Sequence, residues 1–160
     1  ASLDNDEPVS VCQDLVGHSK HVEIEYSDTY FGEQARFKSE NDDDRLSLSR
    51  PIKHGIINNW DDMQLLWKYI FDKEIKCLDE DIEYSTIFLS ETPLNPRVLR
   101  EKAVQMMFET FNCSAYYTQN TAVLELYSHG QTTGMTIGCG FDTCYTVPVY
   151  QGYALAHGTN

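Results

Sequence analysis

Histidine and cysteine are the side chains of this chain that could bind a metal or form disulfides, and their spacing predicts neither. His18 and His21 lie close together, but in a polar segment without other ligand types at metal spacing. The five cysteines are odd in number and scattered, with no CxxC pair. We therefore expect no metal site, and cysteines that are reduced and mostly buried as small apolar side chains. The remaining histidines are His54, His129 and His157, and the cysteines are Cys12, Cys77, Cys113, Cys139 and Cys144.

Acidic residues dominate the charge of the chain. Asp and Glu number 25 against 12 Lys and Arg, which gives a net charge of −13. Nucleic acid and anionic membranes would be repelled, so we expect neither as a partner and favour a basic protein surface. The acids cluster at residues 4–7, 40–44 and 79–83, and solvated loops are the favoured interpretation over a dedicated binding surface. No basic leader or long apolar run is seen, which predicts a cytosolic setting.

The first third of the chain predicts short strands separated by an acidic loop. Residues 1–20 mix polar and apolar types and are interpreted as a loosely held arm or one strand. Residues 22–26 alternate apolar and polar side chains, as half-buried strands do, and 30–32 end that strand. Residues 39–44 predict an acidic loop, and 46–51 a strand that ends at a proline.

The rest of the chain alternates helical and strand patterns. Asn59 is an N-cap type of residue ahead of an apolar stripe that recurs every three or four positions, which predicts an amphipathic helix. Residues 86–90 form a short apolar run typical of buried central strands. This alternation indicates the α/β class. Further predicted elements are helices over 97–111 and 121–128, a strand over 115–117, and a hairpin of strands 135–138 and 144–149. The second helix should bury Val98, Leu99, Val104, Met107, Phe108 and Phe111.

Several segments resemble the actin family in order and at similar spacing. His54–Met63 reads HGIINNWDDM and resembles the HGIxxNWDDM signature that opens a helix in that family. Glu91–Arg97, Met107–Asn112 and Thr146–Leu155 are similar to its T-E-x-P-L-N-P, M-F-E-T-F-N and T-V-P-I-Y-E-G-Y-A-L segments. The resemblance extends over about Ser27 to His157. It implies a partial actin-like fold related to ribonuclease H, a mixed sheet with flanking helices.

The resemblance also implies a division into domains. Residues 1–20 would form an N-terminal arm, residues 21–134 the first actin-like domain, and residues 135–160 the hairpin that opens the second. Since family members continue well beyond this point, the chain would contain the first hairpin of the second domain without the rest of that domain. Exposed strand edges and apolar faces are association surfaces. We therefore expect a protein partner that covers the missing half, or self-association.

In the actin family, two hairpin loops hold Mg-ATP, since backbone amides cradle phosphates and carboxylates hold the hydrated metal. The first loop has no counterpart here, because residues 4–6 are only superficially similar to it. Where the second loop has D-S-G-D-G, the chain has altered residues, and Thr121 takes the position of the water-orienting glutamine. Phosphoryl transfer depends on positioned charge, so we expect no ATPase activity and only a vestigial nucleotide site. The loop residues are Gly138, Cys139, Gly140, Phe141 and Asp142.

These features favour a non-catalytic, actin-related structural component of a larger cytoskeletal-type assembly that binds partner proteins. We expect it in the cytoplasm with the cytoskeleton, with nuclear placement left open. His54 takes the place of the family's methylated histidine, and a packed, hydrogen-bonded role is at least as plausible as modification. One alternative is an actin-family ATPase seen as a truncated or split chain, where a second chain would complete the cleft for ATP and Mg. The other is a stand-alone actin-mimicking binding module.

Overall fold

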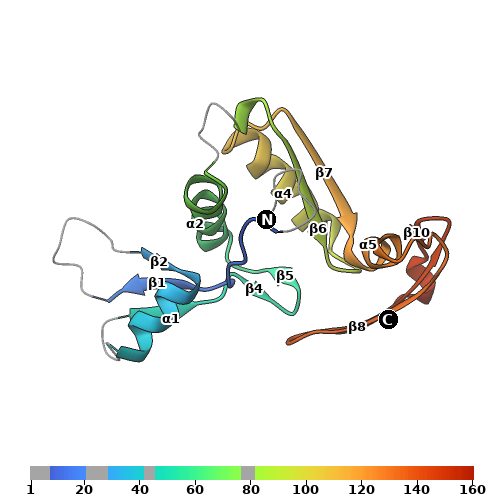
Figure 1. Cartoon of the computed structure of the whole chain (residues 1–160), viewed down its shortest axis with the longest axis horizontal. Coiled ribbons are helices and arrows are strands. Elements are labelled where there is room, and N and C mark those ends of the chain that lie inside the picture. Colours follow the sequence, from blue (N-terminus) through green and yellow to red (C-terminus); the bar gives the residue numbers. More distant parts are fainter. Residues whose placement is uncertain (1–7, 21–28, 42–45, 77–81) are drawn as a thin grey trace. The chain divides into compact units, whose positions relative to one another are not determined.

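The structure is a computed structural model that describes residues 8–20, 29–41, 46–76 and 82–160 (Figure 1). The strand predicted over 22–26 lies outside these described residues. Residues 4–6, which are superficially similar to a phosphate loop, also lie outside the described residues, as do His21 and Cys77. The chain divides into two compact units, Ala1–Lys53 with Ile57–Asp79, and His54–Ile56 with Glu80–Asn160.

The first unit contains a three-stranded antiparallel sheet in the order β2-β1-β3. Gly17 lies where the sheet meets helix α1, because a Cβ added there would be 3.2 Å from the Cβ of Ala35. Ala35 is fully buried against the sheet. The strand expected over 46–51 is confirmed. The elements are β1 Val16–Ser19, β2 Thr29–Phe31, α1 Gly32–Asn41 and β3 Leu46–Ser49.

Helix α1 corrects the prediction of an acidic loop that begins at Ser39. Residues 39–41 form its last turn, and only Gly32 and Ala35 of the helix are buried. Because glycine has no side chain beyond hydrogen, Ala35 contributes the one buried side chain of this helix. The helix therefore lacks the repeated apolar positions from which a helix is predicted in a sequence. An Arg36 to Glu40 ion pair at 3.0 Å, four residues apart, supports it instead.

Helix α2, Trp60–Tyr69, confirms the helix predicted after Asn59. The Asn59 side chain accepts a hydrogen bond from the backbone N–H of Asp62 at 3.2 Å, which satisfies a free donor of the first turn. Met63 and Trp67 of the predicted stripe are buried, and the helix continues as a π-helix, η1 Ile70–Ile75. Before it come the short strands β4 Ile52–Lys53 and β5 Ile56–Ile57.

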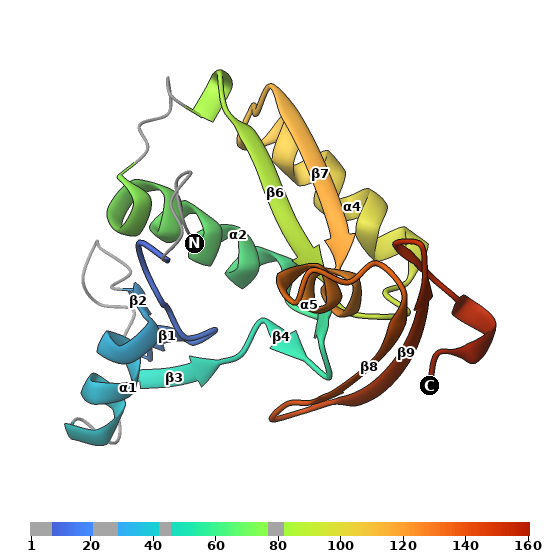
Figure 2. The ribbon, with the colours of Figure 1, turned by 45° about the vertical axis from the view of Figure 1, so that its right-hand side comes forward.

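The second unit begins with a parallel strand pair, β6 Thr86–Glu91 and β7 Ala115–Asn120, joined by helix α4 Arg97–Glu109. Figure 2 shows α4 running alongside these two strands. Strand β6 is not the buried central strand that was predicted: Ile87 is buried, but Phe88 is 50% exposed. Likewise α4 buries Met107, whereas Val98 and Phe108 are exposed. Within the described residues, this strand pair covers only one side of the helix.

Helix α5 and a three-stranded antiparallel sheet complete the second unit, with the strands in the order β10-β9-β8. The predicted helix 121–128 and the predicted hairpin are both confirmed. Ala122 and Val123 of the helix pack with Val147 and Val149 of β9 in a buried core. The elements are α5 Thr121–Ser128, β8 Gly134–Cys139, β9 Cys144–Tyr150, β10 Tyr153–Ala154 and the 3-10 helix η2 Ala156–Gly158.

Candidate functional site

The predicted loop residues lie at the tip of the β8–β9 hairpin. Gly140 donates its backbone N–H to the carbonyl of Thr143 at 2.8 Å, which closes the turn. The strands are paired so that Gly138 lies opposite Tyr145 and Cys139 opposite Cys144. Phe141 at the turn is 89% exposed. The tip is therefore a short turn between paired strands, with its aromatic side chain turned to solvent.

The space beside Gly138 is filled by the Tyr145 ring. A Cβ added to Gly138 would lie 2.6 Å from both Cε2 and the hydroxyl oxygen of Tyr145. The ring also packs against the core of α5 and β9, and its hydroxyl donates a hydrogen bond to Oε1 of Glu125 at 2.7 Å. Any side chain at position 138 must therefore displace a ring held by packing and by a charge-assisted hydrogen bond.

Thr121 belongs to the same cluster. Burial, followed by the hydrogen bond to Glu125, raises the pKa of the Tyr145 hydroxyl, while the neighbouring Thr121 side chain opposes this rise. Among the described residues, the Thr121 hydroxyl is a buried polar group without a hydrogen-bond partner of normal geometry. The structure thus brings Thr121 and Gly138 together around Tyr145, and leaves Phe141 apart from them.

Asp142 binds the turn that contains His54. The backbone N–H of His54 donates to Oδ2 of Asp142 at 2.9 Å, and both residues belong to the second unit. His54 has a φ of 51° and Gly55 a φ of 71°, so the chain turns sharply here in a conformation that side chains disfavour. The Thr92 hydroxyl donates to the carbonyl of Gly55 at 2.8 Å and supports the same turn. The Asp142 carboxylate therefore acts as a structural acceptor.

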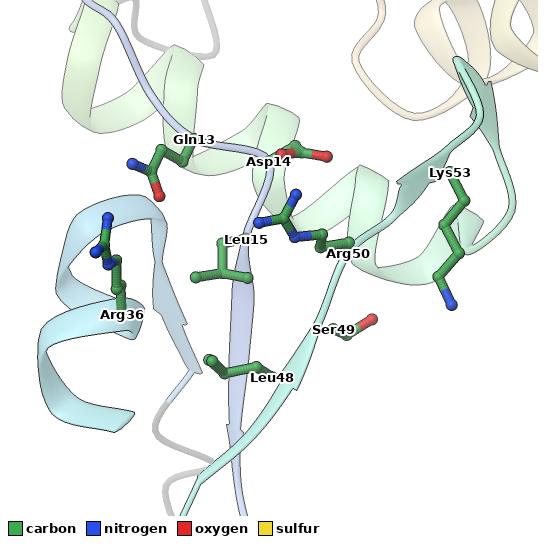
Figure 3. Close-up of a pocket in the computed structure, with 8 residues that line it drawn as sticks. All are labelled: Gln13, Asp14, Leu15, Arg36, Leu48, Ser49, Arg50 and Lys53. Carbon is green, nitrogen blue, oxygen red and sulfur yellow. The ribbon is translucent and has the colours of Figure 1, made fainter. Parts of the chain in front are cut away.

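A separate pocket in the first unit has a volume of about 730 Å³. Figure 3 shows Leu15 and Leu48 between Arg36 of α1 on one side and Lys53 on the other. The lining offers cations for a polar ligand but neither a thiol nor an imidazole, and it contains none of the predicted site residues. Its other lining residues are Gln13, Asp14, Ser49 and Arg50.

Comparison with known proteins decides the family. The profile described as Actin matches residues 3–160. The chain belongs to the actin family. It is 39% identical over 145 residues to Centractin of Saccharomyces cerevisiae, a match that covers 88% of this chain and 36% of that protein. It is 38% identical over 145 residues to an Actin-like protein of Neurospora crassa, covering 88% of this chain and 37% of that protein. The chain therefore spans little more than a third of the length of these relatives.

The predicted family and the partial actin-like α/β fold are thus confirmed. In this actin-family chain the parallel and antiparallel strands of the described residues lie in separate small sheets. The predicted domain boundaries at 20 and 134 stay a prediction. No helix in the described ranges is long and apolar enough to cross a membrane. The same ranges contain no cluster of three or more His, Cys, Asp or Glu suited to a metal, and Nε2 of His18 instead contacts Oδ1 of Asp62 at 2.7 Å.

Sequence reasoning missed two residues of this actin-family site, Tyr145 and Glu125. A glycine directly opposite a large aromatic residue on a hairpin is the signal that could have identified Tyr145, once the register was known. Glu125 is separated from Tyr145 by 20 positions and lies on another element, so no local pattern joins them. The cysteines also correct the prediction: Cys113 is buried, but Cys139 and Cys144 are exposed.

We expect the Asp142→Ala substitution to loosen the His54 turn. A hydrogen bond of this kind contributes about 0.5–1.5 kcal/mol, so exchange of the His54 amide hydrogen should accelerate about 2- to 10-fold. The measurement is native-state hydrogen exchange resolved at His54. Asp142→Asn is the matched control, because it keeps a side-chain oxygen at the same position. Equal exchange rates in the alanine variant and the unmodified protein would contradict the structural role of Asp142.

Proposed function

We propose that this chain is a non-catalytic, actin-related structural component of a larger cytoskeletal-type assembly, where it binds partner proteins. The observation that carries the proposal is the Tyr145 ring, which occupies the space that a side chain at position 138 would need. Position 138 is where the family resemblance places the first aspartate of its second phosphate loop. In this proposal, packed and hydrogen-bonded side chains take the place of the family's reacting centre. These side chains are Tyr145, Glu125 and Thr121.

The residues at the hairpin tip do not fit a hydrated magnesium ion and phosphates. Neither Gly138 nor Phe141 supplies a carboxylate, and hard cations of this type prefer carboxylate oxygens and water. The Asp142 carboxylate is hydrogen-bonded to His54, and the Thr121 hydroxyl lies beside Tyr145. We therefore propose that the protein has no ATPase activity and that this loop contributes nothing to nucleotide binding.

Calorimetry with Mg-ATP tests this part of the proposal. For the natural protein that carries this sequence, we expect no binding of Mg-ATP with a micromolar dissociation constant. We also expect no phosphate release above the uncatalysed rate. Conventional actin under the same conditions is a suitable positive control for both assays. Micromolar binding together with phosphate release would overturn the proposal in favour of an actin-family ATPase, and binding without hydrolysis would favour a cleft completed elsewhere or by a second chain.

The partner-binding part rests on the outer face of the hairpin, which we define by Met135, Ile137 and Phe141. They are 60%, 65% and 89% exposed, whereas Thr136 between the first two is buried against α5, where its hydroxyl donates to the Ala122 carbonyl. The hairpin is therefore apolar on the solvent side as well as on the core side. Met135 and Ile137 alternate on one face of β8, and exposed apolar patches mark protein association sites. A second protein is the occupant we propose for the outer hairpin face.

Light scattering on a sizing column, with mass spectrometry of whatever co-elutes, tests this part. We expect the natively purified protein to elute with a stoichiometric second protein. A dimer of the chain alone would assign the face to self-association. A clean monomer would favour the stand-alone binding module instead. We place the assembly in the cytoplasm with the cytoskeleton, and imaging of the tagged protein in cells would separate this location from the nucleus.

A further inference from the structure

The structure brings two exposed thiols together at the hairpin tip. Cys139 is the last residue of β8 and Cys144 the first of β9, and they are direct partners in the antiparallel register. Directly opposed residues of an antiparallel pair point to the same face of the sheet. Both cysteines are free and exposed. They are therefore neighbours that reagents in solution can reach whenever no partner covers the outer hairpin face.

The turn geometry decides how close the two cysteines lie. Gly140 and Thr143 form a hydrogen-bonded pair through the 2.8 Å bond between them. Hydrogen-bonded and non-hydrogen-bonded pairs alternate along an antiparallel ladder, so Cys139 and Cys144 form the next, non-hydrogen-bonded pair. Such pairs have Cα atoms about 4.5 Å apart, which lies within the range of about 4.4–6.8 Å that disulfides span. The backbone therefore needs no rearrangement for the two sulfurs to bond.

The side chains already interact. A hydrogen bond with Cys139 is the main cause that raises the pKa of the Cys144 thiol, and the charge of Cys139 adds to this effect. Such an effect arises between thiols that lie near each other, as the register of the two strands also places them. Cys113, by comparison, is buried, so reagents in solution reach its thiol less readily than the two exposed thiols of the hairpin.

We propose that Cys139 and Cys144 form a dithiol site that small disulfides of the glutathione class oxidise to a cross-strand disulfide. One cysteine thiolate attacks a sulfur of the small disulfide, forms a mixed disulfide and releases one small thiolate. The thiolate of the other cysteine then attacks the protein sulfur of that mixed disulfide, which forms the Cys139–Cys144 bond and releases the second small thiolate. In total the protein dithiol loses two electrons and two protons, and one small disulfide becomes two small thiols.

A bond between Cys139 and Cys144 closes the tip of the hairpin covalently around the four residues 140–143. A disulfide on an exposed, solvent-accessible turn is of the labile kind that a thiol buffer can reverse. It therefore fits a reducing compartment, where it forms only when small disulfides accumulate. The inference does not depend on the proposed absence of ATPase activity, so either can fail without the other.

The test uses the natural protein in buffers with defined ratios of oxidised to reduced glutathione. After acid quenching and differential alkylation, peptide mass spectrometry should find Cys139 linked to Cys144 at high ratios and both free at low ratios. Cys139→Ser and Cys144→Ser variants should each stop at the glutathione adduct on the remaining cysteine. The Cys113→Ser variant, as the matched control, should form the same cross-strand disulfide as the unmodified protein.

A second probe keeps the test decisive if a serine variant folds poorly. Phenylarsine oxide binds two adjacent thiols together, so the unmodified protein should bind one equivalent at the hairpin and thereby block both cysteines against alkylation. Two outcomes would overturn the proposal. One is an unmodified protein in which both cysteines remain reduced, or carry separate glutathione adducts, at high ratios. The other is linkage of Cys139 or Cys144 to a different cysteine in place of each other.

Discussion

Replacing Gly138 with aspartate is expected to lower the free energy of unfolding of the β8–β9 hairpin by about 2–4 kcal/mol. The new side chain must expel the Tyr145 ring, because a Cβ at this position would already lie 2.6 Å from the ring and its hydroxyl. The displaced ring loses its contacts with the core of α5 and β9 and its hydrogen bond to Glu125. A second carboxylate near Glu125 adds repulsion between like charges.

Native-state hydrogen exchange of the β9 amides measures this change in the hairpin directly. Gly140→Ala is the matched control, since a Cβ there would meet only the Thr143 carbonyl oxygen at an ordinary 3.5 Å. This control should leave the exchange rates within the range of the unmodified protein. Combining Gly138→Asp with Tyr145→Ser removes the ring that clashes and should recover part of the loss. Unchanged β9 protection in the aspartate variant would show that the ring moves aside freely, and the argument for a filled site would fail.

The same pair of residues shows what the sequence could and could not predict about the site. The altered loop was recognisable because its residues lie next to one another in a segment that resembles the family. The role of the Tyr145 ring was not recognisable from the sequence. The ring fills the space beside Gly138 because of the cross-strand register and its bond to a helix residue, Glu125, that is distant in sequence. Asp142 was likewise assigned to the altered loop from its position alone, whereas its partner is the His54 backbone, 88 positions away. Local patterns show which residues differ from the family's loop, and tertiary contacts decide which partners those residues have.

The fold follows a similar division. Helix α5 and the β8–β9 hairpin were predictable because their apolar positions repeat with clear periods and pack onto each other. Helix α1 was not predictable, since it buries a single methyl side chain and leaves its other apolar side chain, Phe37, exposed among polar residues. Strand β6 was assigned to a buried centre from its apolar run, yet Phe88 stacks on Tyr117 of β7 with a centroid distance of 5.6 Å on the exposed face. Burial therefore depends on neighbouring elements as well as on the run itself.

Two methionines of the second unit separate stability from association. Met107 is, among the described residues, the largest fully buried side chain, whereas Met135 on the outer hairpin face is 60% exposed. Truncating a buried methionine removes its contacts and leaves a cavity, so Met107→Ala is expected to lower the free energy of unfolding by about 2–5 kcal/mol. The matched Met135→Ala change should stay within about 0.5 kcal/mol, as substitutions on a surface do.

Chemical denaturation, with hydrogen exchange of the α4 and β7 amides, measures the stability of both variants. Co-elution with the partner on the sizing column measures association. Met135→Ala should weaken co-elution at unchanged stability, because it removes apolar area from the outer hairpin face and nothing from the core. Met107→Ala should lower stability and leave co-elution unchanged at temperatures where the unit stays folded, since the Met107 side chain of α4 is fully buried. If both variants lost the partner in proportion to their stability, the hairpin face would have no binding role of its own, and association would depend only on the folded state of the unit.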